Sequence, residues 1–92
     1  MKRLEIIHLR LATDCSKDLV DNIRRSAASN THADLKIFQH AGVAKDLGIH
    51  ILHDNDDTEE LPSPLGVSLA SALKAHGMVE HSVWIERNEE VQ

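Results

Sequence analysis

Six segments alternate along the 92-residue chain, and their order limits the possible fold more than any other feature. Four segments are short, apolar and rich in β-branched residues, which is typical of strands. They cover residues 4–12, 33–40, 47–54 and 78–86. The other two, residues 16–29 and 64–76, repeat apolar residues at helical spacing. The predicted order is therefore strand, helix, strand, strand, helix, strand.

Residues with capping chemistry mark where both predicted helices begin. Asp14 and Ser16 precede the first helix, and their side-chain oxygens can accept hydrogen bonds from its free amides. Ser63 is the expected N-cap of the second helix, and Pro64 takes the first helical position, where no amide donor is needed. We expect Gly77 to end this helix as a left-handed cap.

This order of elements predicts one α+β domain with the ferredoxin-like fold. Two split β-α-β units with right-handed crossovers give a four-stranded antiparallel sheet in the order 4-1-3-2, with both helices on one face. The domain is expected to cover residues 1–87, followed by a charged C-terminal tail, residues 88–92.

Alternate residues of each strand must face opposite sides of the sheet. The side expected beneath the helices is almost entirely aliphatic and comprises Ile7, Leu9, Leu11, Leu35, Ile37, Ile49, Ile51, Val83 and Ile85. The other side, the open face, is expected to present Ile6, His8, Arg10, Phe38, His40, His50, Leu52 and Trp84. A sheet face in contact with water should be polar, yet this one carries the only two aromatic residues of the chain.

Apolar patches with polar rims are typical of association surfaces, where aromatic residues and arginine are enriched. The open face therefore predicts a homodimer in which two sheets pack face to face about a two-fold axis. The same residues are our candidates for binding a small ligand or a protein partner. No catalytic residue can be assigned from the sequence.

In topology and open-face character, residues 3–87 resemble the dimeric α+β-barrel superfamily. The resemblance implies two ferredoxin-like protomers packed sheet to sheet. Its members include cofactor-free monooxygenases and haem-degrading enzymes, which implies as an alternative function an oxygenase with a pocket between sheet and helices. The haem-degrading branch uses an asparagine on the first strand together with a tryptophan and a histidine. Trp84 and His76 match in type, but residues 4–12 contain no asparagine, so this chemistry is not transferred.

Composition argues against several other classes. A formal net charge of −5 repels phosphate backbones, and the near absence of aromatic residues removes stacking platforms, so no nucleic-acid partner is expected. Cys15 is the single cysteine, which is compatible with a reducing compartment. No apolar segment reaches membrane-spanning length, and Glu5, His8 and Arg10 interrupt the resemblance of the N-terminus to a signal peptide. We expect a cytoplasmic protein without a cofactor.

Three of the seven histidines, His8, His40 and His50, are expected on the open face and on neighbouring strands. Converging imidazoles can bind a divalent metal, but imidazoles hydrogen-bonded in a dimer interface are the simpler interpretation, and no metal site is assigned. Histidines buried in a neutral form would also make the dimer sensitive to pH. For His53, His76 and His81, capping and surface roles are sufficient.

Two further features have ordinary explanations. Cys15 stands near a helix start, which favours a reactive thiolate, but it lacks a second cysteine and has acidic neighbours, so a structural role is favoured. The acidic segment 54–60 lacks the alternation and the glycine of an EF-hand loop, so we expect a solvated loop.

Overall fold

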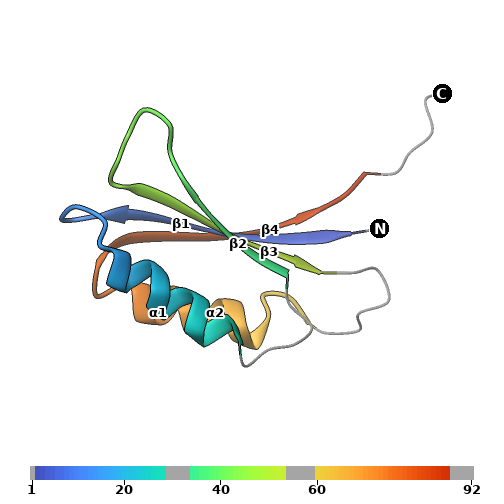
Figure 1. Ribbon diagram of the computed structural model, residues 1–92. Helices are drawn as coiled ribbons and strands as arrows, with labels where there is room; N and C mark the ends of the chain where they lie inside the picture. The colour runs from blue at the N-terminus through green and yellow to red at the C-terminus, as the bar shows by residue number, and fades with distance from the viewer. Residues whose placement is uncertain (1, 29–33, 54–59, 88–92) are drawn as a thin grey trace.

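The computed structural model describes residues 2–28, 34–53 and 60–87. Six elements follow in the predicted order (Figure 1), namely β1 (Arg3–Leu11), α1 (Lys17–Ala28), β2 (Asp34–Gln39), β3 (Asp46–His53), α2 (Pro64–Leu73) and β4 (Gly77–Ile85). Most of the acidic segment and the C-terminal tail lie outside the described residues.

The four strands form one antiparallel sheet in the order β2-β3-β1-β4. This is the predicted order read from the opposite edge, and it confirms the ferredoxin-like layout. In the registers, Ile7 of β1 lies opposite Ile49 of β3 on one side and His81 of β4 on the other. On the far side of β3, Ile37 of β2 lies opposite Ile49.

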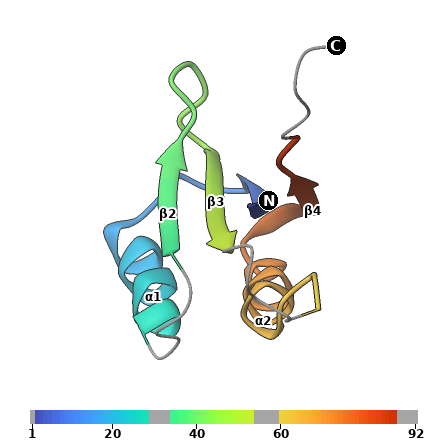
Figure 2. The ribbon, with the colours of Figure 1, turned by 90° about the vertical axis from the view of Figure 1, so that its right-hand side faces the viewer.

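Both helices pack on the same face of the sheet (Figure 2), where they bury an aliphatic core. The core consists of Ile7, Leu9, Leu11, Leu19, Ile23, Leu47, Ile49, Ile51, Leu69, Ala70 and Leu73. Because Ile7, Leu9, Ile49 and Ile51 are fully buried on alternate positions of the two central strands, the predicted division of the strand residues between two faces is confirmed.

Two residues expected on the helix side, Val83 and Ile85, do belong to that side by register, since they lie opposite Glu5 and Arg3. Both are nevertheless exposed, with relative accessibilities of 36% and 59%. The physical reason is visible in Figure 1, where the end of β4 extends past the helices.

The helix starts agree with the capping predictions, whereas the end of α2 does not. Ser16 Oγ accepts a hydrogen bond from the Leu19 amide at 3.1 Å, and Ser63 Oγ accepts one from the Gly66 amide at 3.0 Å. The prediction for Gly77 was wrong.

Gly77 is the first residue of β4, and no glycine among the described residues has a positive φ. The physical reason for a glycine here is the close approach of two strands. A β-carbon at this position would overlap the carbonyl oxygen of Arg10 in β1.

Among the described residues, no helix covers the second face of the sheet, which is the predicted open face (Figure 1). The turn between β2 and β3 and the end of β4 both rise on this side. Within the described residues, no helix is long and apolar enough to cross a membrane.

Candidate ligand-binding site

A glycine in the middle of β3 creates a hollow on the open face. Gly48 lies between Phe38 of β2 and His8 of β1, so the three positions form one row across the sheet. Because Gly48 has no side chain, the His50 ring can lean toward it, and a β-carbon added at Gly48 would lie 3.4 Å from His50 Nε2. Glycine within a strand often marks such a place, where a ligand can approach the backbone.

The resulting pocket has a volume of about 320 Å³. It is lined by Ile6, His8, Phe38, Gln39, His40, Asp46, Leu47, Gly48 and His50. The rings of Phe38 and His50 contact each other at one side, with centroids 4.7 Å apart and planes tilted by 53°. Most of the lining surface is apolar, and the polar groups are concentrated near the turn between β2 and β3.

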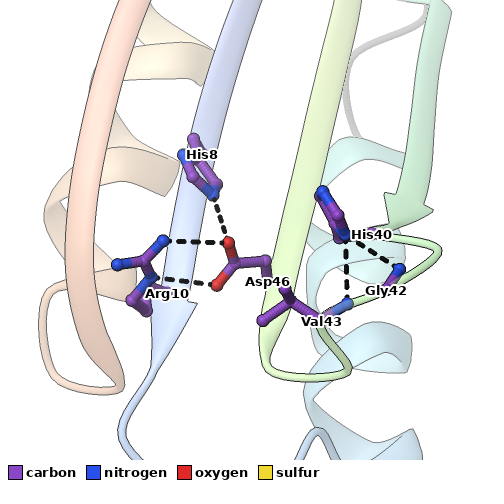
Figure 3. A network of polar contacts seen from close by, with 6 residues as sticks. All are labelled: His8, Arg10, His40, Gly42, Val43 and Asp46. Carbon is purple, nitrogen blue, oxygen red and sulfur yellow. Dashed lines mark hydrogen bonds and ion pairs between the residues drawn. The ribbon is translucent and has the colours of Figure 1, made fainter.

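A buried carboxylate organises the polar end of the pocket (Figure 3). Asp46, which is 5% exposed, accepts hydrogen bonds from Arg10 Nε at 3.1 Å and Arg10 Nη2 at 3.3 Å. His8 Nε2 lies 3.2 Å from the same carboxylate. Hydrogen bonding to Arg10 lowers the pKa of Asp46 and raises the pKa of Arg10. Asp46 is therefore ionised at neutral pH, so His8 must carry its proton on Nε2 and donate it.

His40 stabilises the turn that forms the same end of the pocket. Its Nδ1 accepts hydrogen bonds from the amides of Gly42 at 2.9 Å and Val43 at 3.0 Å (Figure 3). An imidazole nitrogen that accepts from two amides carries no proton, so the ring proton of His40 is on Nε2. The pocket therefore has a neutral N–H donor at this end.

Five of the eight predicted site residues line this pocket: Ile6, His8, Phe38, His40 and His50. Arg10 adjoins it through Asp46. Leu52 and Trp84 lie on the same face but in another row, since both register with Leu4.

His8 also lines a second hollow of about 120 Å³ with Arg10, Met78, Val79 and Glu80. Within the described residues, no three histidine, cysteine, aspartate or glutamate side chains are grouped closely enough to hold a metal ion.

A second polar cluster lies beneath the sheet, on the helix side. Glu5 of β1 is completely buried and contacts two imidazoles, with His53 Nε2 2.7 Å from Oε1 and His81 Nε2 2.8 Å from Oε2. The expectation of capping and surface roles for these two histidines was wrong, because His53 is 2% exposed. The cluster joins β1, β3 and β4.

Burial and hydrogen bonding act on Glu5 in opposite directions. Burial raises the pKa of the Glu5 carboxyl, but hydrogen bonds with Ser63, His81 and His53 together outweigh it, so the pKa lies below its ordinary value. The N-terminus of α2 approaches so closely that a β-carbon at Gly66 would overlap Glu5 Oε2. The cluster is thus filled by protein groups, which indicates a structural role.

The residues that the sequence predictions missed had recognisable signals. Glu5 and His81 share the strand parity of aliphatic core residues, so a buried ionic contact on the helix side could have been inferred. Gly48 interrupts an apolar strand, which is the usual sign of a close approach. Asp46 was assigned to the connection between strands, and no local pattern indicates that Arg10 would bind it.

Compared with protein-family models, curated proteins and solved structures, the chain shows no significant similarity to any of them. Its fold and the geometry of its pocket are therefore the basis for any functional assignment.

Proposed function

We propose that the protein is a self-associating, ferredoxin-like binding module whose open face packs against a second copy and encloses a small ligand in the pocket over Gly48. The resemblance to the dimeric α+β-barrel superfamily agrees with this assembly. The observation that carries the proposal is a sheet face that neither helix covers and that combines the pocket over Gly48 with the exposed side chains of Phe38, Met78 and Trp84.

The exposed side chains on this face support self-association. Phe38, Met78 and Trp84 are 50%, 75% and 59% exposed, and all three lie on the open side by register. Large apolar side chains exposed on one face are typical of interfaces, and burying them is favourable by about 25 cal/mol per Å² of apolar surface.

The charges at the two sheet edges fit a two-fold arrangement. Lys36 is exposed on the edge strand β2, and Glu80 is exposed on the opposite edge strand β4. A two-fold axis parallel to the strands would place β2 of one copy over β4 of its partner. Lys36 and Glu80 would then pair twice across the interface, which favours this orientation over one that superposes like edges.

Sedimentation velocity of the wild-type chain and two open-face variants tests the proposal. We expect a dimer for the wild type at micromolar concentration, and a dissociation constant raised at least about tenfold in Phe38→Ser and Trp84→Ser. Val67→Ser is the matched control, because Val67 is 52% exposed on α2, on the other side of the molecule. A monomeric wild type would contradict the proposal.

A charge exchange tests the orientation separately. Lys36→Glu and Glu80→Lys should each weaken the dimer, because each places like charges opposite each other, and the double variant should restore it. Additive losses in the double variant would contradict the pairing of these edges.

A second candidate function, an enzyme, is favoured by the fixed orientation of His8. An imidazole that donates to a buried carboxylate keeps its other nitrogen available as a proton acceptor, as a general base requires. An enzyme would convert the bound ligand, whereas a binding module would release it unchanged. Mass spectrometry of ligand recovered after incubation distinguishes the two.

A further inference from the structure

The outer edge of β4 presents backbone groups that the sheet leaves unpaired. Among the described residues, β4 pairs only with β1, so it is an edge strand. The amide of Glu86 donates to the carbonyl of Lys2 at 2.8 Å, and the carbonyl of His76 accepts from the amide of Ala12 at 3.0 Å. Because hydrogen-bonded residues alternate along an antiparallel strand and the register is continuous, the even-numbered residues of β4 bond with β1. The odd-numbered residues therefore direct their N–H and C=O groups toward the free edge.

The end of β4 is apolar on both sides of the sheet. Val83 and Ile85, on the helix side, are 36% and 59% exposed, because this end of the strand extends past the helices (Figure 1). Trp84, on the open side, is 59% exposed. Both Val83 and Ile85 are odd-numbered, so their amides are free donors at the edge. The strand contains neither a proline nor a bulge that would prevent an extended chain from adding as a further strand.

Two glutamates limit which strand can add to this edge. Glu80 and Glu86 are exposed on the open side of β4 and flank Trp84. On the β1 side, the charge of Arg10 acts on Glu80, and the amide of Lys2 donates to the Glu86 carboxylate at 3.3 Å. On the free side, the position opposite each carboxylate belongs to the added strand. Because opposite charges at facing positions stabilise a strand pair and like charges destabilise it, the edge favours lysine or arginine at both positions.

A second copy of the chain is the less favourable occupant. An antiparallel pair of β4 strands centred on Val83 would place Glu80 of each copy opposite Glu86 of the other. It would also need a two-fold axis perpendicular to the sheet and beside β4, whereas the face-to-face dimer has its axis parallel to the strands and over the middle of the sheet. These axes do not intersect, so the two contacts together would give an open-ended assembly instead of a closed one.

We infer that the free edge of β4 binds an extended segment of another protein by strand addition. The segment carries apolar residues opposite Val83 and Ile85, and lysine or arginine opposite Glu80 and Glu86. The inference goes beyond the proposed function, because it concerns the edge of the sheet and not the pocket on its open face.

Two peptides of opposite charge test the class of partner. The basic probe is acetyl-Lys-Val-Thr-Val-Thr-Val-Lys-amide, which presents the same side chains in either strand direction, and the control replaces both lysines by glutamates. In ¹H–¹⁵N NMR titrations we expect saturable shifts of the Val83 and Ile85 amides with the basic probe, with a dissociation constant on the order of 0.1 mM. The acidic peptide should bind at least about tenfold more weakly. Equal affinity for both peptides, or no saturable shift with the basic one, would overturn the inference.

A proline substitution tests the backbone contact. Val83→Pro removes an outward N–H without removing a hydrogen bond to β1, and it should weaken binding of the basic probe at least about tenfold in a protein that remains folded. Val83→Thr keeps the N–H and the β-branched shape, and it is the matched control. Ile85→Pro, nearer the end of the strand, replaces Val83→Pro if that variant does not fold. Wild-type affinity in a folded proline variant would overturn strand addition at this edge.

Sedimentation of the same samples separates this inference from self-association. Phe38→Ser weakens the proposed dimer but leaves the edge of β4 intact, so it should bind the basic probe as the wild type does. A monomeric wild type that binds the basic probe supports the inference and overturns self-association. Wild-type oligomers that dissociate in Val83→Pro would show that a second copy occupies the edge, and they would overturn the inference.

Discussion

A single buried carboxylate joins three strands and one helix of this protein. Glu5 contacts His53 and His81 and is also hydrogen-bonded to Ser63 at the start of α2. Ionised carboxylates are rarely fully buried, and this one is compatible with the fold because its acceptor positions are occupied by donors. Removing one partner of such a group leaves the others buried without hydrogen bonds, which costs more than the hydrogen bond itself contributes.

We predict that the stability supported by Glu5 decreases at acidic pH. Its pKa in the folded state is below the ordinary value of 4.5, so between the two values the unfolded chain binds more protons than the folded one. The stabilisation is thus complete above about pH 4.5 and is lost as the pH falls through the folded pKa. Urea unfolding between about pH 5.5 and pH 3.5 measures this loss, in a range where histidines are already protonated in the unfolded chain.

The Glu5→Gln variant isolates this residue from the others. It should lower the free energy of unfolding by about 1–3 kcal/mol at pH 7 and reduce the loss on acidification. Part of the loss should persist, because the pKa of Asp46 is lowered by Arg10 and acts in the same direction. Identical pH slopes in wild type and variant would show that Glu5 does not carry the dependence.

Gly66 and Gly48 both lie inside regular elements, but they differ in how much room a side chain would have. Gly66 lies in α2 directly above the Glu5 carboxylate, where a β-carbon has no room. Gly48 lies in β3, where the nearest atom to an added β-carbon is the flexible His50 ring at 3.4 Å. The first glycine is required by close packing, whereas the second has room for a β-carbon in ordinary contact with the His50 ring.

We therefore predict different outcomes for the same substitution. Gly66→Ala should destabilise the protein by about 2–3 kcal/mol through overpacking, although alanine is the better helix former by about 1 kcal/mol. Gly48→Ala should be neutral or slightly stabilising, because alanine reduces the freedom of the unfolded chain. Thermal or urea unfolding of both variants checks this, and a stable Gly66→Ala would contradict the observed approach of α2 to Glu5.

At the level of elements, the sequence was sufficient to predict the order, type and sheet topology of all six segments. Strand alternation and helix caps are local signals, and they placed Ile7, Ile49 and Ser63 correctly. Contacts between distant segments were missed. For example, no local sequence pattern around His53 indicates that it contacts Glu5, which is 48 residues away in the sequence. The prediction for Gly77 was wrong for the same reason, since the Arg10 carbonyl that requires a glycine there belongs to another strand.

The candidate site was predicted only in part. Parity placed His8, His40 and His50 on one face, and the structure brings them around one pocket. The roles of these rings depend on Asp46 and on the turn amides, which only the folded chain brings within hydrogen-bond distance.

At the scale of the whole molecule, the lone tryptophan reports on whether the open face is covered. Trp84 is 59% exposed, and its ring nitrogen donates a hydrogen bond to Ser82 Oγ at 2.9 Å. If a second copy covers this face, dilution from about 100 µM to about 0.1 µM should shift the emission of Trp84 to longer wavelength as the dimer dissociates. If the emission maximum of Trp84 stays constant over this range at the wavelength of a hydrated indole, a second copy does not cover the open face.

The residue at position 48 can also be compared across homologous sequences. If the pocket over Gly48 binds a ligand as proposed, the residue aligned with Gly48 in a homologous chain should indicate whether that chain can bind the ligand too. On that proposal, a homologue with a bulky side chain at this position should not bind the ligand, even where the rest of the sheet is unchanged.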